Sequence, residues 1–436
     1  MAIIKKIIVI LLIIVVAVSL ASLLGFTKVK LPFLKPKAVT LTYWGLWEEE
    51  NVIKPLIDDY QKNHPNVTIN YIKQSKIQYR ERLQNVIDKG EGPDLFRFHN
   101  TWLPMFKNSL SPLPKSVMTV QEFQNTFYPV AYDNLFSNGN IYGLPLEVDT
   151  LALFYNEDLF QKGGATVPTT WNELRAVANS LTVKDADGRI KISGIALGTA
   201  GNIEHFSDIL GLMFMQNGTD LRKISSTFSK DGHNLGEDTL KYYTNFTLLD
   251  HVWDETMDNS IVAFAGGKVA MIIAPSWEIF EIKNLNSTLP FKIVPVPQIP
   301  EKNLNWATYW VEGVSAKSKN QEAAWDFLNY LVTKENLIKM YTLCANSRLF
   351  GEPYSRLDLA ATLKSDVLVS PFITQTSNAA SWYLASRTYD NGINDQNIKY
   401  LEDAVNNVIR GGDVLKSLQT VEQGFSQVLD RYQTSQ

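Results

Sequence analysis

The chain has 436 residues, of which 45% are hydrophobic and 20% are charged. This composition is typical of a globular protein and excludes a disordered one, and the length suits two lobes of ordinary size. The single cysteine, Cys344, excludes an internal disulfide and a cysteine-based metal cluster.

The formal net charge of −4 is unevenly distributed along the chain. The first 37 residues contain six lysines and no acidic residue, so the other 35 Lys and Arg face 45 Asp and Glu, and the remaining chain carries −10. Phosphate contacts need clustered Lys and Arg, so we expect no nucleic-acid partner.

The N-terminal segment contains an apolar run, Ile7–Phe26, that follows Lys5 and Lys6. Its 20 residues would form a helix of roughly 30 Å, the thickness of a bilayer core. We predict that residues 1–26 are a signal anchor or a cleaved signal peptide, and that the basic residues 27–38 are a tether. No cysteine is nearby, so we expect no lipid-modified N-terminus.

From Val39 the pattern is α/β. Val39–Trp44 alternates as a strand, a helix begins near Asn51, and residues 66–72 form a second strand. A second helix is predicted over 76–89, ended by Gly90, and a third strand over 94–98. This order predicts a parallel, doubly wound sheet, in which ligands bind beyond the carboxyl ends of the strands. The segments Trp44–Trp47 and His99–Trp102 follow such ends and are therefore expected to face a crevice.

The rest of the chain continues the α/β pattern. Thr170 and Glu173 form a capping box that opens a helix through Leu181, and the last 40 residues form two helices separated by Gly411-Gly412. Further elements are strands at 151–155 and 269–274, a turn at 185–189 and a helix at 320–333. The turn, DADGR, lacks calcium-loop spacing.

No catalytic signature, phosphate-binding loop or dinucleotide motif is present, and the five histidines lack metal-ligand spacing. We expect no cofactor and no metal. What remains is a group of tryptophans near turns and strand ends: Trp44, Trp47, Trp102, Trp277, Trp306, Trp310 and Trp382. Flat indole faces beside carboxylates and amides suit a sugar, whose apolar face packs on the ring while its hydroxyls form hydrogen bonds.

Two groups of carboxylates require separate interpretations. Glu49 and Glu50 fit the first turn of a helix, where the helix dipole stabilises acids, which leaves Glu48 as the one candidate ligand contact. Glu147 and Asp149 share a face of an extended segment and could be the carboxylate pair of a glycoside hydrolase or transferase.

Taken in series, several segments resemble the family 1 extracellular solute-binding proteins of ABC importers, which are maltose-binding-protein-like. The segments are LTYWGLWEEENVIKPLIDDYQKNHPNVTINY (41–71), GPDLFRFHNTW (92–102), YGLPLEVDTLALFYNEDLF (142–160), TTWNEL (169–174), FAGGKVAMIIAPSW (264–277) and GVSAKSKNQEAAWDFLNYLVT (313–333). They follow the family's order and cover most of residues 39–345.

The resemblance implies a two-lobe, clamp-like periplasmic-binding-protein fold of type II after the N-terminal transmembrane or signal helix. Chain crossings are expected near 146–150, 307–313 and 347–355. The lobes would comprise residues 39–147 with 313–348, and 148–312 with 349–436. The expected ligand-binding residues are Trp44, Trp47, Glu48, His99, Asn100, Trp102, Glu147, Asp149, Trp277, Trp310, Glu312 and Trp382.

The implied function is the extracytoplasmic substrate-binding subunit of an ABC importer, which binds a sugar or oligosaccharide and presents it to the permease. The protein would be a monomer that performs no chemistry and is anchored by its N-terminal helix or released. Arg97 and Thr101 depart from the family, which has an aromatic and a basic residue there, and this argues against maltose itself. The alternatives are a glycoside hydrolase or transferase using Glu147 and Asp149, and a non-transporting sensor on the same fold.

Overall fold

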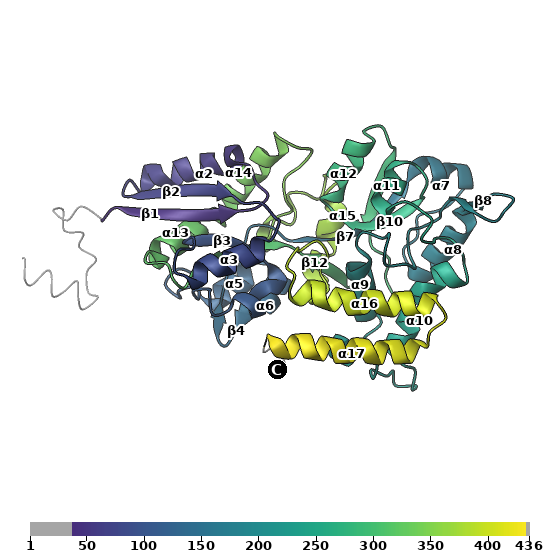
Figure 1. Cartoon of the computed structure of the whole chain (residues 1–436). Coiled ribbons are helices and arrows are strands. Elements are labelled where there is room, and N and C mark those ends of the chain that lie inside the picture. Colours follow the sequence, from purple (N-terminus) through teal and green to yellow (C-terminus); the bar gives the residue numbers. More distant parts are fainter. Residues whose placement is uncertain (1–36, 433–436) are drawn as a thin grey trace, which may run out of the picture.

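The computed structural model describes residues 37–432 as two mixed β-sheets, side by side and each flanked by helices (Figure 1). The predicted signal anchor and nearly all of the tether lie outside the described residues. Within the described part of the chain, every helix is too short or too polar to span a bilayer. Buried residues from both sheets join in a shared hydrophobic core.

The first sheet has the strand order β2-β1-β3-β13-β6. Its strands are β1 (Val39–Gly45), β2 (Val67–Lys73), β3 (Leu95–His99), β13 (Trp310–Val314) and β6 (Leu144–Pro145). The three predicted strands are confirmed, and β1 pairs in parallel with β2 and β3. The parallel order predicted for these three strands is therefore confirmed, but the sheet as a whole is mixed, because β13 runs antiparallel to β3 and β6. Strand β13 begins at the carboxyl end of β3, where Trp310 pairs with His99. It therefore runs in the direction opposite to β3.

The helices around the first sheet agree with the sequence pattern. They include α2 (Glu50–Asn63), α3 (Tyr79–Asp88), α13 (Gln321–Leu331) and α14 (Lys334–Ala345). Helix α2 buries an apolar stripe that runs from Val52 to Tyr60, and it keeps Pro55 near its start. Helix α3 begins three residues later than predicted, since Gln78 adopts a left-handed conformation with φ 52°.

The second sheet has the order β10-β7-β12-β14, with β11 also paired to β7. Its strands are β7 (Asp149–Asn156), β10 (Met271–Pro275), β11 (Phe291–Pro295), β12 (Asn305–Thr308) and β14 (Ala379–Ala380). Strand β7 is antiparallel to β10, β11 and β12. The predicted strands at 151–155 and 269–274 are therefore confirmed, but their antiparallel pairing was not anticipated.

Smaller predictions for this half are also confirmed. Helix α8 (Trp171–Leu181) has the capping box of Thr170 and Glu173. The DADGR turn joins β8 (Val183–Lys184) to β9 (Ile190–Ile192). The remaining elements are α4 (Leu103–Phe106), α5 (Val120–Thr126), α6 (Pro129–Leu135), α7 (Glu157–Gly163), α9 (Phe206–Gln216), α10 (Leu235–Leu248), α11 (Ser260–Ala265), α12 (Glu278–Leu285) and α15 (Ser370–Thr374), with β4 (Phe136–Ser137) and β5 (Asn140–Ile141).

The C-terminal helices α16 (Ile393–Ile409) and α17 (Val414–Arg431) form the predicted pair and pack against α10 (Figure 1). Gly411, with φ +88°, takes the left-handed conformation that ends α16.

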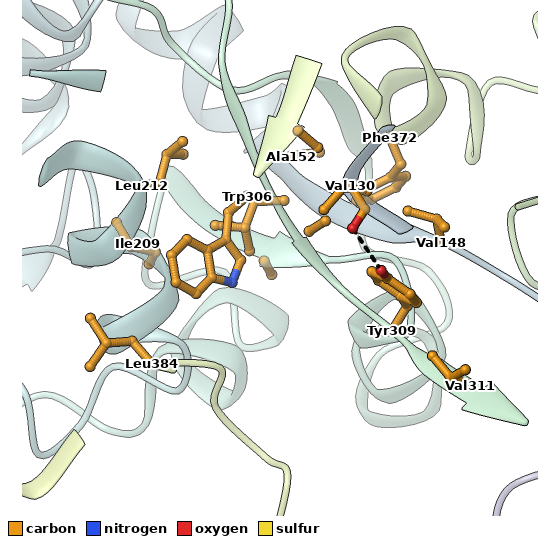
Figure 2. Packing of buried hydrophobic residues seen from close by; sticks show 14 of the residues in the cluster. Val130, Val148, Ala152, Ile209, Leu212, Trp306, Tyr309, Val311, Phe372 and Leu384 are labelled. Carbon is orange, nitrogen blue, oxygen red and sulfur yellow. Dashed lines mark hydrogen bonds between the residues drawn. The ribbon is translucent and has the colours of Figure 1, made fainter. Parts of the chain in front are cut away.

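The chain passes between the sheets from β6 to β7, from β12 to β13, and after α14. The second passage is anchored on both sides (Figure 2). Trp306 is fully buried against Ile209 and Leu212 of α9, and the Tyr309 hydroxyl donates to the Val130 carbonyl over 3.2 Å. The link between β12 and β13 is thus held in the core at each end.

Candidate functional site

A cavity of about 510 Å³ is lined by residues of both sheets and of the segments that join them. Six of the twelve sequence-predicted ligand-binding residues line it: Trp47, His99, Glu147, Asp149, Trp277 and Trp310. The other six, Trp44, Glu48, Asn100, Trp102, Glu312 and Trp382, do not.

An aromatic group on the first-sheet side centres on Trp310. Its ring meets Trp47 edge to face at 5.5 Å, His99 at 5.2 Å and Trp102 at 5.3 Å between centroids. Trp102 is fully buried, so it supports Trp310 from behind. Trp47 and Trp310 keep part of their surface open to the cavity, where an apolar ligand face could pack.

The two neighbouring tryptophans Trp44 and Trp47 have different environments. Trp44 belongs to β1, where it pairs with Ile72 and Phe96, and packs on the hydrophobic core. Trp47 belongs to the loop after β1 and reaches the cavity. Of the two indoles, Trp47 is therefore the one available to a ligand.

Glu48 and Glu312 are occupied by a buried ion pair. Arg97 donates from Nη1 to Glu48 Oε2 over 2.5 Å and from Nε to Glu312 Oε1 over 2.6 Å. All three residues are buried. Burial acts to raise the pKa of both carboxyl groups, and the Arg97 guanidinium acts to lower it. The pKa of Glu48 is lowered as a result, whereas the pKa of Glu312 is raised. A charged residue inside the apolar strand DLFRF was the signal that could have revealed this pair.

Asn100 and Trp382 also have structural roles in this conformation. Asn100 is buried and donates to Asn134 Oδ1 at 2.8 Å and to Ser381 Oγ at 2.9 Å. Trp382 packs on Phe425 of α17 with ring centroids 4.9 Å apart.

The residues that depart from the family pattern do not line the cavity either. Arg97 is held by the ion pair, and Thr101 binds His99 and Asn394. Neither Arg97 nor Thr101 therefore lies where it could contact a ligand in the cavity.

His99 is a neutral group in the cavity wall. Its Nδ1 lies 2.8 Å from Thr101 Oγ1 and its Nε2 lies 3.0 Å from Thr308 Oγ1. Burial lowers its pKa to about 3, because a charged ring would lose its contact with water.

The two carboxylates proposed as a hydrolase pair differ from each other. Asp149 accepts hydrogen bonds from Ser276 Oγ at 2.6 Å and from the Ser276 backbone N–H at 3.0 Å. Burial raises its pKa to about 7 despite these bonds. Glu147 is 5% exposed, and burial raises its pKa well above the usual range.

The second-sheet side contributes Trp277, which precedes α12, and a buried charged group behind it. His205 lies edge to face with Trp277 at 6.0 Å and bonds to Glu278 Oε1 at 3.0 Å and to Ser386 Oγ at 2.7 Å. Burial disfavours the imidazolium, but Asp208 and Glu278 outweigh burial and raise the pKa of His205 to about 9. Glu278 and Ser386 line the cavity, and the protonated imidazole of His205 holds both side chains in place.

A segment that precedes α16 completes the wall with Ser386, Arg387 and Tyr389. Arg387 pairs with Glu204, and its guanidinium donates to the Tyr389 hydroxyl over 3.2 Å. Lys76, from the segment between β2 and α3, donates to the same hydroxyl over 3.0 Å. Tyr389 therefore joins the two sides of the cavity.

Sequence reasoning missed many lining residues, among them Lys76, Glu204, Glu278, Arg348, Glu352, Arg387 and Tyr389. Glu278 begins helix α12, next to Trp277, which the resemblance had identified. The others come from segments outside the helices and strands and carry no motif.

A family model described as bacterial extracellular solute-binding protein matches residues 55–347 of the chain. Among curated proteins, the maltotriose-binding protein of Pyrococcus abyssi is 24% identical over 303 residues. That match covers 68% of this chain and 62% of the relative, less than two thirds of its length.

Solved structures share the fold. The sugar-binding protein MalE from Xanthomonas citri has a TM-score of 0.72 at 19% identity and covers 91% of this chain and 98% of its own. A cyclic alpha-maltosyl-1,6-maltose binding protein from Arthrobacter globiformis also has 0.72, at 17% identity, with 90% and 100% covered. The architecture is therefore the α/β periplasmic-binding-protein fold with two mixed sheets.

Proposed function

Because this chain belongs to the bacterial extracellular solute-binding protein family, we propose that it is the extracytoplasmic substrate-binding subunit of an ABC importer. It binds a sugar or oligosaccharide in the cavity between the sheets. The observation that carries this proposal is the lining, which combines three partly exposed indoles, Trp47, Trp277 and Trp310, with carboxylates and hydroxyls. The indoles pack on the apolar faces of sugar rings, and the polar groups bind the hydroxyls.

The named ligands of similar proteins support this ligand class. The Pyrococcus abyssi relative is named for maltotriose and the Arthrobacter globiformis structure for a cyclic maltosyl-maltose. Both are oligosaccharides, and a cavity of about 510 Å³ falls within the usual range for small-molecule sites.

The proposed mechanism is a shift in population. Two lobes, 39–147 with 313–348 and 148–312 with 349–436, close on the ligand, because a ligand that touches both walls binds the closed state more tightly than the open one. The permease then recognises the closed state.

The test is calorimetric titration with a panel of linear and cyclic oligosaccharides. At least one sugar binds the wild type, and Trp310→Ala and Trp277→Ala each weaken binding at least tenfold. The matched control, Phe228→Ala, changes an aromatic that is 59% exposed and lies outside the cavity lining, and it leaves binding unchanged. If every sugar fails to bind the wild type, or if both tryptophan variants bind as the wild type does, the proposal is wrong.

The location and partners follow from the same proposal. The N-terminal apolar segment either anchors the protein to the membrane or is cleaved on export. The partners are the transmembrane permease subunits, and the protein acts as a monomer. Mass spectrometry of the protein from its own host measures the mature N-terminus. A start at Met1 supports an anchor, and a start just after Ser19-Leu20-Ala21, which has the small-x-small pattern of a signal-peptide cleavage site, supports release.

The alternatives require different observations. A glycoside hydrolase would turn over a glycan in a reaction abolished by Glu147→Gln, but the carboxylate of Asp149 is already held by Ser276 and the matched family is one of binding proteins. A sensor on the same fold would be encoded beside a kinase gene, whereas an importer subunit would be encoded beside permease genes.

A further inference from the structure

Three glutamates from distant parts of the chain meet beside the cavity. Glu48 belongs to the loop after β1, Glu147 to the passage from β6 to β7, and Glu352 to the passage after α14. One carboxylate oxygen of each lies within 4.8 Å of the other two. Glu48 and Glu147 are each 5% exposed, so the group is held largely away from water.

Two of these carboxylates have an oxygen that no protein group satisfies. Among residues 37–432, Glu48 Oε1 and Glu147 Oε2 are buried and receive no hydrogen bond. A buried polar atom without a partner is unfavourable, and more so when the group is charged. Both residues belong to the group of three, so one cation bound there can supply a partner to each of them.

The charges around the group are also unbalanced. Arg97 pairs with Glu48 and Glu312, and Arg348 donates to Glu352 Oε1 over 2.5 Å. Glu147 adds a fourth carboxylate to these two guanidinium groups. When all four carboxylates are ionised, two negative charges are left without compensation, which is the charge that one divalent cation supplies.

We propose that Glu48, Glu147 and Glu352 form a binding site for a divalent cation that prefers oxygen ligands, of which Ca²⁺ is the model. Calcium binds carboxylate oxygens at about 2.3–2.6 Å, so one ion reaches ligand atoms that are about 4.8 Å apart. The ion ties the loop that carries Trp47 to two of the segments that join the sheets. This proposal does not depend on the identity of the sugar.

The test uses the full chain in detergent, treated with EDTA, desalted and free of sugar. Calcium chloride alone is titrated by calorimetry, and the melting temperature is measured with and without it at neutral pH. The wild type binds Ca²⁺ and melts at a higher temperature with it. Glu147→Gln and Glu352→Gln each weaken Ca²⁺ binding at least tenfold and lose the rise in melting temperature. Glu335→Gln, an exposed acid at the start of α14, behaves as the wild type.

The proposal is overturned if Ca²⁺ neither binds nor stabilises the wild type, or if both glutamine variants bind it unchanged. It is also overturned if acidification stabilises the wild type and Ca²⁺ does not, since a proton then balances the charge. Circular dichroism establishes that each variant is folded. If Glu147→Gln does not fold, Glu352→Gln decides the question, because that side chain is 15% exposed and tolerates substitution better.

Discussion

Arg97 of β3 and Glu312 of β13 are cross-strand partners whose side chains are joined by a bond of 2.6 Å from Nε to Oε1, both 0% exposed. The same guanidinium reaches Glu48 in the loop that leads to α2. This ion pair therefore ties the loop that carries Trp47 to the antiparallel strand that carries Trp310, and the aromatic side of the cavity depends on it.

Replacement of Arg97 is expected to destabilise the protein strongly. Arg97→Met leaves Glu48 and Glu312 buried without their cation, and loss of one partner of a buried pair costs about 3–5 kcal/mol. Urea unfolding measures the loss. Adding Glu48→Gln and Glu312→Gln restores part of the stability, because no buried charge then remains unpaired.

The control for this prediction is an exposed ion pair. Lys54 pairs with Asp58 on α2 and its side chain is 57% exposed, so Lys54→Met is expected to cost at most about 1 kcal/mol. Equal losses for Arg97→Met and Lys54→Met would contradict the structural role of Arg97.

His205 is expected to make stability fall in alkaline solution. Its folded pKa is about 9, above the unfolded value of 6.5, because the carboxylates of Asp208 and Glu278 bind the imidazolium. Its contribution to stability is therefore complete below about pH 6.5 and is lost as the pH rises through about 9. Urea unfolding of the wild type from pH 6 to 10 measures this loss.

The matched variant for this effect is His205→Gln, which keeps a hydrogen-bonding side chain without the titration. It is expected to be less stable than the wild type at pH 6.5, with a smaller further loss toward pH 10. Parallel pH profiles for the two proteins would assign the alkaline loss to other groups.

Tyr389 is expected to slow the release of a bound sugar. Its hydroxyl accepts from Lys76 on one side of the cavity and from Arg387 on the other. Tyr389→Phe removes both bonds, so the dissociation rate of the tightest sugar rises several-fold in stopped-flow fluorescence. Tyr400→Phe, a change on α16 outside the cavity lining, is the control and leaves the rate unchanged. An unchanged rate in Tyr389→Phe would mean that this bridge does not hold the two sides together.

Trp306 is expected to be structural, with no direct role in ligand binding. It is fully buried near Ile209, Leu212 and Leu384 (Figure 2), so Trp306→Ala costs about 3–5 kcal/mol of unfolding free energy. Trp306→Phe costs less, since most of the volume remains. Val367→Ala, at a side chain that is 80% exposed, stays within about 0.5 kcal/mol of the wild type. A stable Trp306→Ala with weakened sugar binding would reverse this assignment.

Local pattern determined most of the secondary structure of this protein. The alternation at Val39–Trp44, the stripe on α2, the capping box at Thr170 and the break at Gly411 each depend on residues close in the chain. Such signals act through backbone geometry within a few residues, so they can be found without knowledge of the fold. The family resemblance also depends on short segments in order.

The tertiary structure decided what those segments do. The antiparallel direction of β13, the burial of Trp102 and the separation of Trp44 from Trp47 depend on strands that meet across long stretches of chain. Glu48 faces Arg97 and Glu312, and beside them it meets Glu147 and Glu352, although these residues are far apart in sequence. Charge pairing and burial are properties of three-dimensional neighbours, and no local spacing encodes them.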